Sequence, residues 1–407
     1  MQTEGEKKPK KFAFVIQGEG RGHLTQAIAL KALLEKNGHE ICAILVGRSP
    51  VRVIPSFFKE KIGCEIFQYD SPNFIRDRHQ KGVRISRTII YNIRKTGTYT
   101  QSLHEIHEHL TAAKPDVIIN FYEVLFGLYS VLYQPQAAIF CIGHQYLNGH
   151  PDFPFPRHTY WSKFLFKINT WITGLRCRSY LALSFDTYPP FDDPFLYVVP
   201  PVLRKDIFEL EPTRGDHFLV YLLNEGYFAE LIRWHKRNPE FKIHAFWDKK
   251  DVEDPYEVSE NLIFHQISDT LFLELMASCR GLATTAGFES VSEAAYLGKP
   301  VLMVPTKGHF EQRCNALDAQ RAGIGIYSRK FDLTRLIQFE ESYEPIPRLQ
   351  EWIESAESAI LPQLERGTEN QSFSRFLSRV LGFIFRKKTD PSVEDGQKDE
   401  YHPLSKR

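Results

Sequence analysis

One stretch, residues 284–316, constrains the fold more than any other part of the sequence. Its pattern predicts the end of a strand, a turn containing Gly287, a helix over about residues 289–297 and a buried strand over residues 300–304. A second helix follows near Glu311. Strands that alternate with helices in this way are connected as parallel neighbours in one sheet. The stretch therefore predicts an α/β fold.

The turn before the first of these helices is suited to an anion. A glycine lets the backbone come close to a ligand, and the N–H groups and positive dipole end of the helix then face that ligand. Glu293 follows one turn into the helix, where its carboxylate can accept hydrogen bonds from two ribose hydroxyls. We therefore expect a nucleotide here. Gly298 and Pro300 also suit a helix end and a strand start, whatever the turn binds.

These residues resemble a known family. The run G-F-x-S-x-x-E-A-x-x-x-G-K-P-V, followed by E-Q-x-x-N-A, is similar to the donor-binding half of GT-B glycosyltransferases. The similar enzymes are the UDP-glucuronosyl- and plant UDP-glycosyltransferases and the bacterial enzyme that adds N-acetylglucosamine to lipid I. The resemblance implies two Rossmann-like domains with parallel sheets facing a central cleft. It also implies a UDP-sugar as co-substrate, with no other cofactor and no metal.

The resemblance assigns donor contacts residue by residue. It places the diphosphate at the turn, the ribose at Glu293 and the sugar hydroxyls at Glu311 and Gln312, a pair that fits a hexose without distinguishing glucose, galactose and N-acetylglucosamine. Two further positions stand at the ends of predicted strands. The expected donor-binding residues are Asn224, Ile267, Thr285, Ala286, Gly287, Phe288, Glu293, Glu311 and Gln312.

Length and composition limit the number of domains and the class of protein. Its 407 residues suit two α/β domains. A hydrophobic content of 43% with 25% charged residues is typical of a soluble globular protein, and a net charge of +1 gives no reason to expect nucleic acid. Only five apolar residues follow the charged N-terminus, so we expect neither a signal peptide nor a spanning helix. Six separated cysteines are typical of reduced residues in a cytoplasmic protein.

Apolar runs of strand length alternate with amphipathic helices, which predicts parallel sheets covered on both faces. The expected strands are residues 12–17, 40–46, 64–69, 117–121, 137–142 and 180–185, then 217–223, 242–247, 262–267, 281–284 and 301–304. Clustered prolines over residues 188–201 predict a domain boundary, and residues 248–258 a charged loop. We expect an acceptor-side domain over residues 1–190, a nucleotide-sugar domain with a closing helix over residues 191–385, and a disordered tail over residues 386–407.

A glycine-rich loop follows the first predicted strand. A dinucleotide fingerprint needs G-x-G-x-x-G, but His23 stands at the third glycine position and the second strand ends without an acidic residue. We therefore do not expect a nicotinamide cofactor. The alternating glycines Gly18, Gly20 and Gly22 instead let the backbone approach a substrate or its phosphate, and they aim His23 into the cleft.

This loop resembles the acceptor-side loop of the same enzymes, in which a histidine just past the glycines is often the general base. Imidazole has a pKa suited to taking a proton from a hydroxyl. The alternative is that His23 caps its helix or contacts phosphate. In related chains an acidic residue commonly sits just after the strand that here is PDVIIN, but this chain has Asn120, with Glu123 three residues on. Either Glu123 orients His23, or His23 is a weaker base than in the family.

The sequence contains two further groups with histidine. The run from His104 to His109 lacks the spacing H-E-x-x-H, because Glu108 stands where the second histidine is needed, so we interpret it as a solvated helix face. His144 follows an apolar strand, and it either touches the acceptor or is satisfied by the backbone.

The resulting hypothesis is an inverting, metal-independent hexosyltransferase that acts on a hydroxyl acceptor. Retaining GT-B enzymes carry a glutamate eight residues before the ribose glutamate, and that position here is Thr285. A sugar-nucleotide epimerase of the same fold would carry two adjacent carboxylates where this chain has Ser292-Glu293. A non-catalytic UDP-sugar-binding partner would have no need of His23.

The acceptor is less constrained. Residues 157–178 combine aromatic and basic side chains with no acidic one, and residues 373–388 repeat this composition. An apolar face with basic flanks is how a monotopic protein lies on anionic lipid. The same residues also suit helices that pack on a core. The sequence therefore leaves open a lipid acceptor, met by peripheral contact at the inner face of a membrane, and a soluble small-molecule acceptor.

Overall fold

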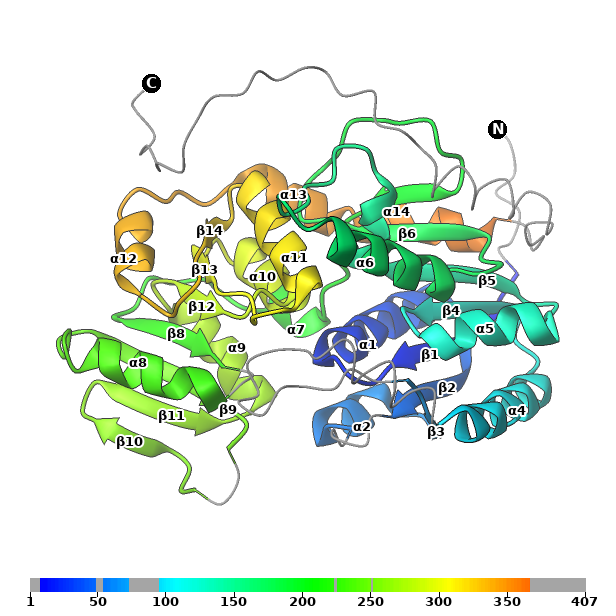
Figure 1. Cartoon of the computed structure of the whole chain (residues 1–407), viewed down its shortest axis with the longest axis horizontal. Coiled ribbons are helices and arrows are strands. Elements are labelled where there is room, and N and C mark those ends of the chain that lie inside the picture. Colours follow the sequence, from blue (N-terminus) through cyan, green and yellow to red (C-terminus); the bar gives the residue numbers. More distant parts are fainter. Residues whose placement is uncertain (1–7, 49–53, 73–94, 223–224, 250–251, 367–407) are drawn as a thin grey trace. The chain divides into compact units, whose positions relative to one another are not determined.

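The computed structural model describes residues 8–48, 54–72, 95–222, 225–249 and 252–366. All of these lie in one compact unit, Met1–Gln371. Within it the described strands form two seven-stranded sheets (Figure 1). The α/β fold with two parallel sheets, predicted from the sequence, is confirmed.

The first sheet has the strand order β3-β2-β1-β4-β5-β6-β7, and every pair in it is parallel. Its strands are β1 (Lys11–Gln17), β2 (Glu40–Arg48), β3 (Ile66–Asp70), β4 (Val117–Phe121), β5 (Ala138–Gly143), β6 (Ser179–Leu183) and β7 (Leu196–Val199). The helices between them are α1 (Arg21–Lys36), α2 (Ser56–Ile62), α4 (Thr96–Ala113), α5 (Val124–Tyr133), the 3₁₀ helix η1 (His144–Gly149) and α6 (Tyr160–Thr173).

The second sheet has the strand order β10-β11-β9-β8-β12-β13-β14, in which only β10 is antiparallel to its neighbour. Its strands are β8 (His217–Tyr221), β9 (Lys242–Trp247), β10 (Tyr256–Ser259), β11 (Leu262–Gln266), β12 (Leu282–Thr284), β13 (Val301–Met303) and β14 (Gly325–Tyr327). The helices are α7 (Lys205–Phe208), η2 (Glu225–Tyr227), α8 (Phe228–His235), α9 (Asp269–Ser278), α10 (Phe288–Tyr296), α11 (Phe310–Arg321), α12 (Thr334–Glu340), α13 (Pro347–Glu354) and α14 (Ala356–Glu365).

Three short strands were not expected. β7 lies inside the proline cluster predicted as a boundary, β10 lies in the predicted charged loop, and β14 follows α11. Each forms an edge of its sheet and has three or four residues, and edge strands bury too little surface to give a long apolar run. The domain boundaries predicted near residues 190 and 385 remain predictions, and residues 367–407 lie outside the described part.

Helix α1 shows how the sequence builds the support for the site. Leu24, Ala27, Leu30 and Leu34 are buried and recur at helical spacing, so one face of α1 packs against the first sheet. The helix ends where Gly38 takes a left-handed conformation with φ of 80°, which glycine adopts without strain. The polar residues of its first turn are thereby held at the carboxyl end of β1.

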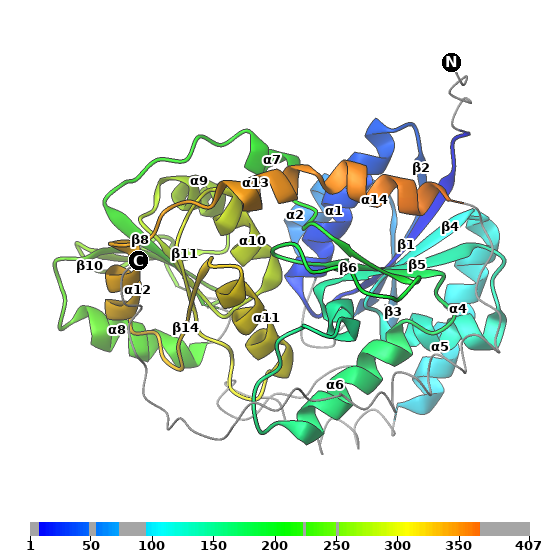
Figure 2. The ribbon, with the colours of Figure 1, turned by 90° about the horizontal axis from the view of Figure 1, so that it is seen from above.

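The faces of the first sheet carry different helices. Residues of α1 and α14 pack on one face, and residues of α4 and α5 pack on the other (Figure 2). Helix α14 follows the second sheet in sequence but returns to the first, where Lys10 Nζ donates to the backbone oxygen of Glu365 at 2.9 Å. The chain therefore crosses between the sheets twice.

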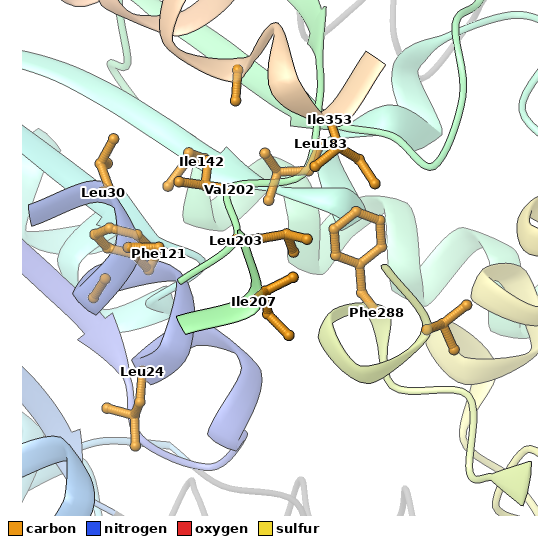
Figure 3. Packing of buried hydrophobic residues seen from close by; sticks show 14 of the residues in the cluster. Leu24, Leu30, Phe121, Ile142, Leu183, Val202, Leu203, Ile207, Phe288 and Ile353 are labelled. Atoms are coloured by element: carbon orange, nitrogen blue, oxygen red, sulfur yellow. The ribbon is translucent and has the colours of Figure 1, made fainter. Parts of the chain in front are cut away.

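One apolar core continues from the first sheet into the second. It contains Leu24 and Leu183 from the first, the connecting residues Leu203 and Ile207, and Phe288 at the start of α10 (Figure 3). Each buried side chain of this size stabilises the fold by roughly 1.5–3 kcal/mol. The core thus holds the beginnings of α1 and α10 against each other, which places polar residues of both sheets in one site.

Candidate active site

The site lies where parallel strands of both sheets end. The loop after β1, η1 after β5, the turn after β12 and the start of α11 after β13 all contribute polar side chains. Ligands of open α/β sheets bind at these carboxyl ends.

The three loop glycines have different neighbours. A Cβ on Gly18 would meet the backbone oxygen of Gly47 at 2.4 Å, and a Cβ on Gly22 would meet the side chain of Glu289 at 3.2 Å. Gly20 precedes α1, and its nearest neighbour would be the His23 ring at 3.9 Å, an ordinary contact. Two of the glycines therefore allow close packing within the protein, and Gly22 does so against the second sheet's helix α10.

His23 lies in the first turn of α1 and is 6% exposed. Its Nδ1 is 3.1 Å from Gln26 Oε1, and its Nε2 is 3.3 Å from Gln145 Nε2. Burial lowers the pKa of His23 to about 4, and the hydrogen bond to Gln26 opposes this only in part. The imidazole is therefore neutral near pH 7, the form that can accept a proton.

Two carboxyl groups of the second sheet's helices continue these contacts. Gln26 Nε2 donates to Glu289 Oε1 at 2.5 Å, and Gln145 Nε2 donates to Glu311 Oε1 at 3.0 Å. Desolvation raises the pKa of Glu289 to about 8, with a contribution from the nearby charge of Glu293. Desolvation also raises the pKa of Glu311 to about 7. We call the five linked residues the His23 network: Glu289, Gln26, His23, Gln145 and Glu311.

The expected pairing of Glu123 with His23 is not found. Glu123 caps α5, and its Oε1 accepts hydrogen bonds from the Ser71 hydroxyl at 2.5 Å and from the backbone N–H of Leu125 at 3.0 Å. Asn120 supports the same turn, because its Oδ1 accepts from the backbone N–H of Glu123. The position beside His23 Nδ1 belongs instead to Gln26, which sequence analysis did not single out.

His144 is also placed differently from either expectation. It is 2% exposed, its Nε2 is 2.9 Å from Asp318 Oδ2, and its ring stacks on Phe288 with centroids 4.6 Å apart. Asp318 is fully buried and also accepts hydrogen bonds from Tyr188 and Arg321. His144 is therefore satisfied by a side chain of α11 and helps to hold η1 against the second sheet.

The turn predicted to bind phosphate has the expected geometry. Gly287 precedes α10 without any side-chain cap, and Ala286 takes a left-handed conformation with φ of 61°. Asn315 of α11 holds this turn, because its Nδ2 donates to the oxygen of Ala286 at 3.0 Å. The hydroxyls of Thr284 and Thr285 are buried and have no partner among the described residues. Unbonded N–H groups and hydroxyls at one helix start form a site for an anion.

The other expected donor residues are partly occupied. Glu293 is 2% exposed, and its Oε1 accepts from Arg204 Nε at 2.7 Å, while Arg204 also forms an ion pair with Asp269. Gln312 Oε1 accepts from the backbone N–H of Thr306 at 2.8 Å. Ile267 is half-buried just after β11. Asn224 lies outside the described residues.

The run from His104 to His109 lies on α4, away from these residues. His104 forms an exposed pair with Glu108 at 3.3 Å, His109 stacks on Phe67, and the His107 ring lies tilted beside Tyr133 with centroids 4.5 Å apart. Across the residues that the structure describes, no group of three or more histidine, cysteine or acidic side chains is arranged to hold a metal ion.

Comparison with known proteins identifies the class. A family model described as "Glycosyl transferase family 1" matches residues 10–342. No curated protein sequence matches the chain.

Solved structures share the fold at low identity. The calicheamicin glycosyltransferase CalG4 has 17% identity and a TM-score of 0.53, covering 94% of this chain and 100% of that one. UGT2 from Phytolacca americana, solved with UDP-2fluoro-glucose and pterostilbene, has 12% identity and a TM-score of 0.56, covering 92% and 99%. MurG from Acinetobacter baumannii has 14% identity and a TM-score of 0.51, covering 88% and 100%. The predicted GT-B fold is thereby confirmed.

The variant Glu289→Gln tests the raised pKa of this carboxyl. A folded-state pKa of about 8 against an ordinary 4.5 means that the folded chain keeps a proton that the unfolded chain releases. The proton that Glu289 keeps therefore stabilises the folded state. This contribution is complete below the pKa of Glu289 in the unfolded chain, and it is lost as the pH rises through the pKa of Glu289 in the folded protein. Because the variant lacks the titration, its stability relative to wild type should improve by roughly 3 kcal/mol from about pH 5 to about pH 8.

The measurement is urea unfolding at both pH values, with the exposed Glu274→Gln on α9 as the matched control. The difference in unfolding free energy between Glu274→Gln and wild type should be the same at both pH values. If the difference in unfolding free energy between Glu289→Gln and wild type is equal at the two pH values, Glu289 is ionised in the folded protein.

Proposed function

Because the chain belongs to glycosyl transferase family 1 and is therefore a glycosyltransferase, we propose that it moves a hexose from a UDP-sugar to a hydroxyl acceptor, with inversion at the anomeric carbon. The observation that carries this proposal is the placement of His23. A buried, neutral imidazole of the first sheet lies between two carboxyl groups carried by helices of the second, beside an uncapped helix start suited to phosphate.

His23 acts as the general base in this proposal. The acceptor oxygen attacks the anomeric carbon as its proton passes to His23 Nε2, and the bond from that carbon to the diphosphate oxygen breaks with its electron pair leaving on UDP. Attack opposite the leaving group inverts the configuration. The leaving charge is stabilised by the N–H groups that start α10 and by the hydroxyl of Thr285, an arrangement that requires no metal ion.

Glu293, Glu311 and Gln312 complete the proposed donor site, with the roles that family resemblance gives them. Glu293 would take the ribose hydroxyls while its Oε1 remains bonded to Arg204, which holds the carboxylate in place. Glu311 and Gln312 lie in the first turn of α11, where they would take the hydroxyls of the hexose. The residue before Glu293 is Ser292, which is buried and donates to the oxygen of Phe288, so this position does not carry the adjacent carboxylate that the epimerase hypothesis needs.

We extend the proposal to a lipid acceptor. The protein would reach it by peripheral contact with the inner face of a membrane that contains anionic lipid. Helix α6 exposes Tyr160, Trp161 and Phe164 by 83%, 68% and 44%. Lys163 projects from the same helix, with its ammonium 4.0 Å from the centre of the Phe155 ring. Exposed aromatic side chains interleaved with lysines are suited to the headgroup region of anionic lipid. No described helix is long and apolar enough to cross a membrane.

Replacing His23 with alanine should lower turnover by about 10²–10⁴, with little change in donor affinity, because it removes a general base. The measurement is acceptor-dependent UDP release, with His104→Ala, an exposed histidine of α4, as the control. If donor binding collapses and turnover of the bound donor survives, His23 is a phosphate ligand. UDP release without a new glycoside would favour the epimerase or the non-catalytic alternative.

Replacing Glu293 with glutamine keeps the size of the side chain and a hydrogen bond to Arg204. It removes the negative charge of the carboxylate that would accept hydrogen bonds from the ribose hydroxyls. We expect UDP affinity to fall by roughly 1.5–3 kcal/mol. Calorimetric titration with UDP measures this, with the exposed Glu351→Gln on α13 as the control. Unchanged affinity would contradict the assignment of ribose to Glu293.

The double variant Trp161→Ser and Phe164→Ser tests the membrane contact. Wild type should sediment with anionic vesicles at low salt, less at high salt and little with neutral vesicles, because salt screens the lysines. The double variant should remain in the supernatant, whereas Tyr256→Ser, which removes an exposed aromatic of β10, should sediment like wild type. No sedimentation of wild type with anionic vesicles at low salt would leave a soluble acceptor as the better hypothesis.

A further inference from the structure

Both nitrogens of the His23 ring face glutamine amides. Gln26 Oε1 lies 3.1 Å from Nδ1, and Gln145 Nε2 lies 3.3 Å from Nε2. A neutral imidazole carries one hydrogen, on one nitrogen or the other, and only the bare nitrogen can accept a proton. The groups that face the ring therefore decide which nitrogen serves as the base.

The first amide is oriented by Glu289. Gln26 Nε2 donates to Glu289 Oε1, which lies 2.5 Å away. Oε1 accepts this hydrogen bond in the ionised carboxylate, and it also accepts as the carbonyl oxygen of the neutral acid when the proton is on Oε2, which has no partner among the described residues. The other end of the amide, Oε1, must then face the imidazole. Because Gln26 Oε1 has no hydrogen to give, the hydrogen of their contact comes from His23 Nδ1. This end of the His23 network places the ring hydrogen on Nδ1.

The second amide is oriented independently by Glu311. Gln145 Nε2 donates one hydrogen to Glu311 Oε1 at 3.0 Å and directs the other at His23 Nε2. A donor facing Nε2 requires a lone pair on that nitrogen. The two ends of the network, which use different glutamines and different helices, specify the same form of the ring.

Water cannot replace these contacts easily, because the inner members of the network are shielded. The exposed fractions are 6% for His23, 3% for Gln26, 4% for Gln145 and 7% for Glu289. A buried amide that loses its carboxylate partner is free to rotate, and it would then take whichever orientation satisfies its own NH₂ group. The orientation of each glutamine thus depends on the glutamate beyond it.

We propose that Glu289 and Glu311, acting through Gln26 and Gln145, are positioning residues that hold His23 as the tautomer with hydrogen on Nδ1 and the lone pair on Nε2. This inference deepens the proposed function, on which its catalytic meaning rests. The acceptor hydroxyl takes the place of the Gln145 N–H at Nε2 and transfers its proton there, while Gln26 Oε1 continues to accept from Nδ1. The base is correctly formed only while α10 and α11 contact α1 and η1.

Nitrogen-15 NMR of the histidine side chains tests the proposal, because protonated and bare ring nitrogens have distinct shifts and couplings. Comparison with His23→Gln assigns the signals. Wild type at about pH 7 should show Nδ1 protonated and Nε2 bare. Gln26→Met keeps the shape of the side chain but cannot hydrogen-bond, and it should give a mixture of tautomers or the opposite one. Gln26→Glu should restore the wild-type tautomer, because its carboxylate accepts from Nδ1.

Glu289→Ala should shift the tautomer as Gln26→Met does. Thr25→Val removes a buried hydroxyl of the same helix, which donates to the Arg21 oxygen, and should leave the His23 signals unchanged. A wild-type ring protonated on Nε2, or a wild-type tautomer that persists in both the Gln26→Met and Glu289→Ala proteins, would overturn the proposal.

Kinetics separate this proposal from the proposed function. Gln26→Met should lower kcat by about 10²-fold or more, since a base held as the wrong tautomer is inactive, with the KM for the UDP-sugar nearly unchanged. If the tautomer responds as expected but no UDP-sugar is turned over, the proposed function fails and the positioning role stands. If transfer proceeds in Gln26→Met as in wild type, the positioning role fails and the proposed function stands.

Discussion

The apolar core shared by the two sheets determines the chemistry of the polar residues beside it. Leu24, Leu203 and Phe288 belong to this core, and His23 and Glu289 stand next to two of them in sequence. Because the core excludes water, the histidine loses its charge and the glutamate keeps its proton, so both pKa shifts favour the neutral form. Because His23 is neutral before an acceptor binds, it can take up the proton of the acceptor hydroxyl without first releasing a proton.

Much of the fold was predictable because buried strands have a clear sequence signal. β4 and β9 were expected at the positions where they occur, since each is a segment of strand length in which most residues are apolar. The edge strands β7, β10 and β14 were missed because they are short and partly exposed. The turn before α10 was located by its glycine, although the left-handed residue in it is Ala286, which no rule of turn composition would choose.

The site was predictable where it depends on local pattern and not where it depends on contact between the sheets. His23 was found from the loop before it. Its partner Gln26 stands three residues on, at a spacing that faces the same side of a helix, and that signal could have been used. Gln145 and Glu289 contact their partners only because the sheets pack together, so neither has a sequence signal. Glu123 was chosen because Asn120 stands at the acidic position of the family, and the structure places Glu123 as a helix cap.

The most direct test of this account is the configuration of the product. With a UDP-sugar of α configuration and an acceptor that supports UDP release, the anomeric carbon of the new glycoside should be β, as read from its proton coupling by NMR, with one UDP formed per glycoside. A β product formed in that ratio agrees with attack opposite the leaving group, with His23 as the base. An α product, or UDP formed without any glycoside, would contradict it.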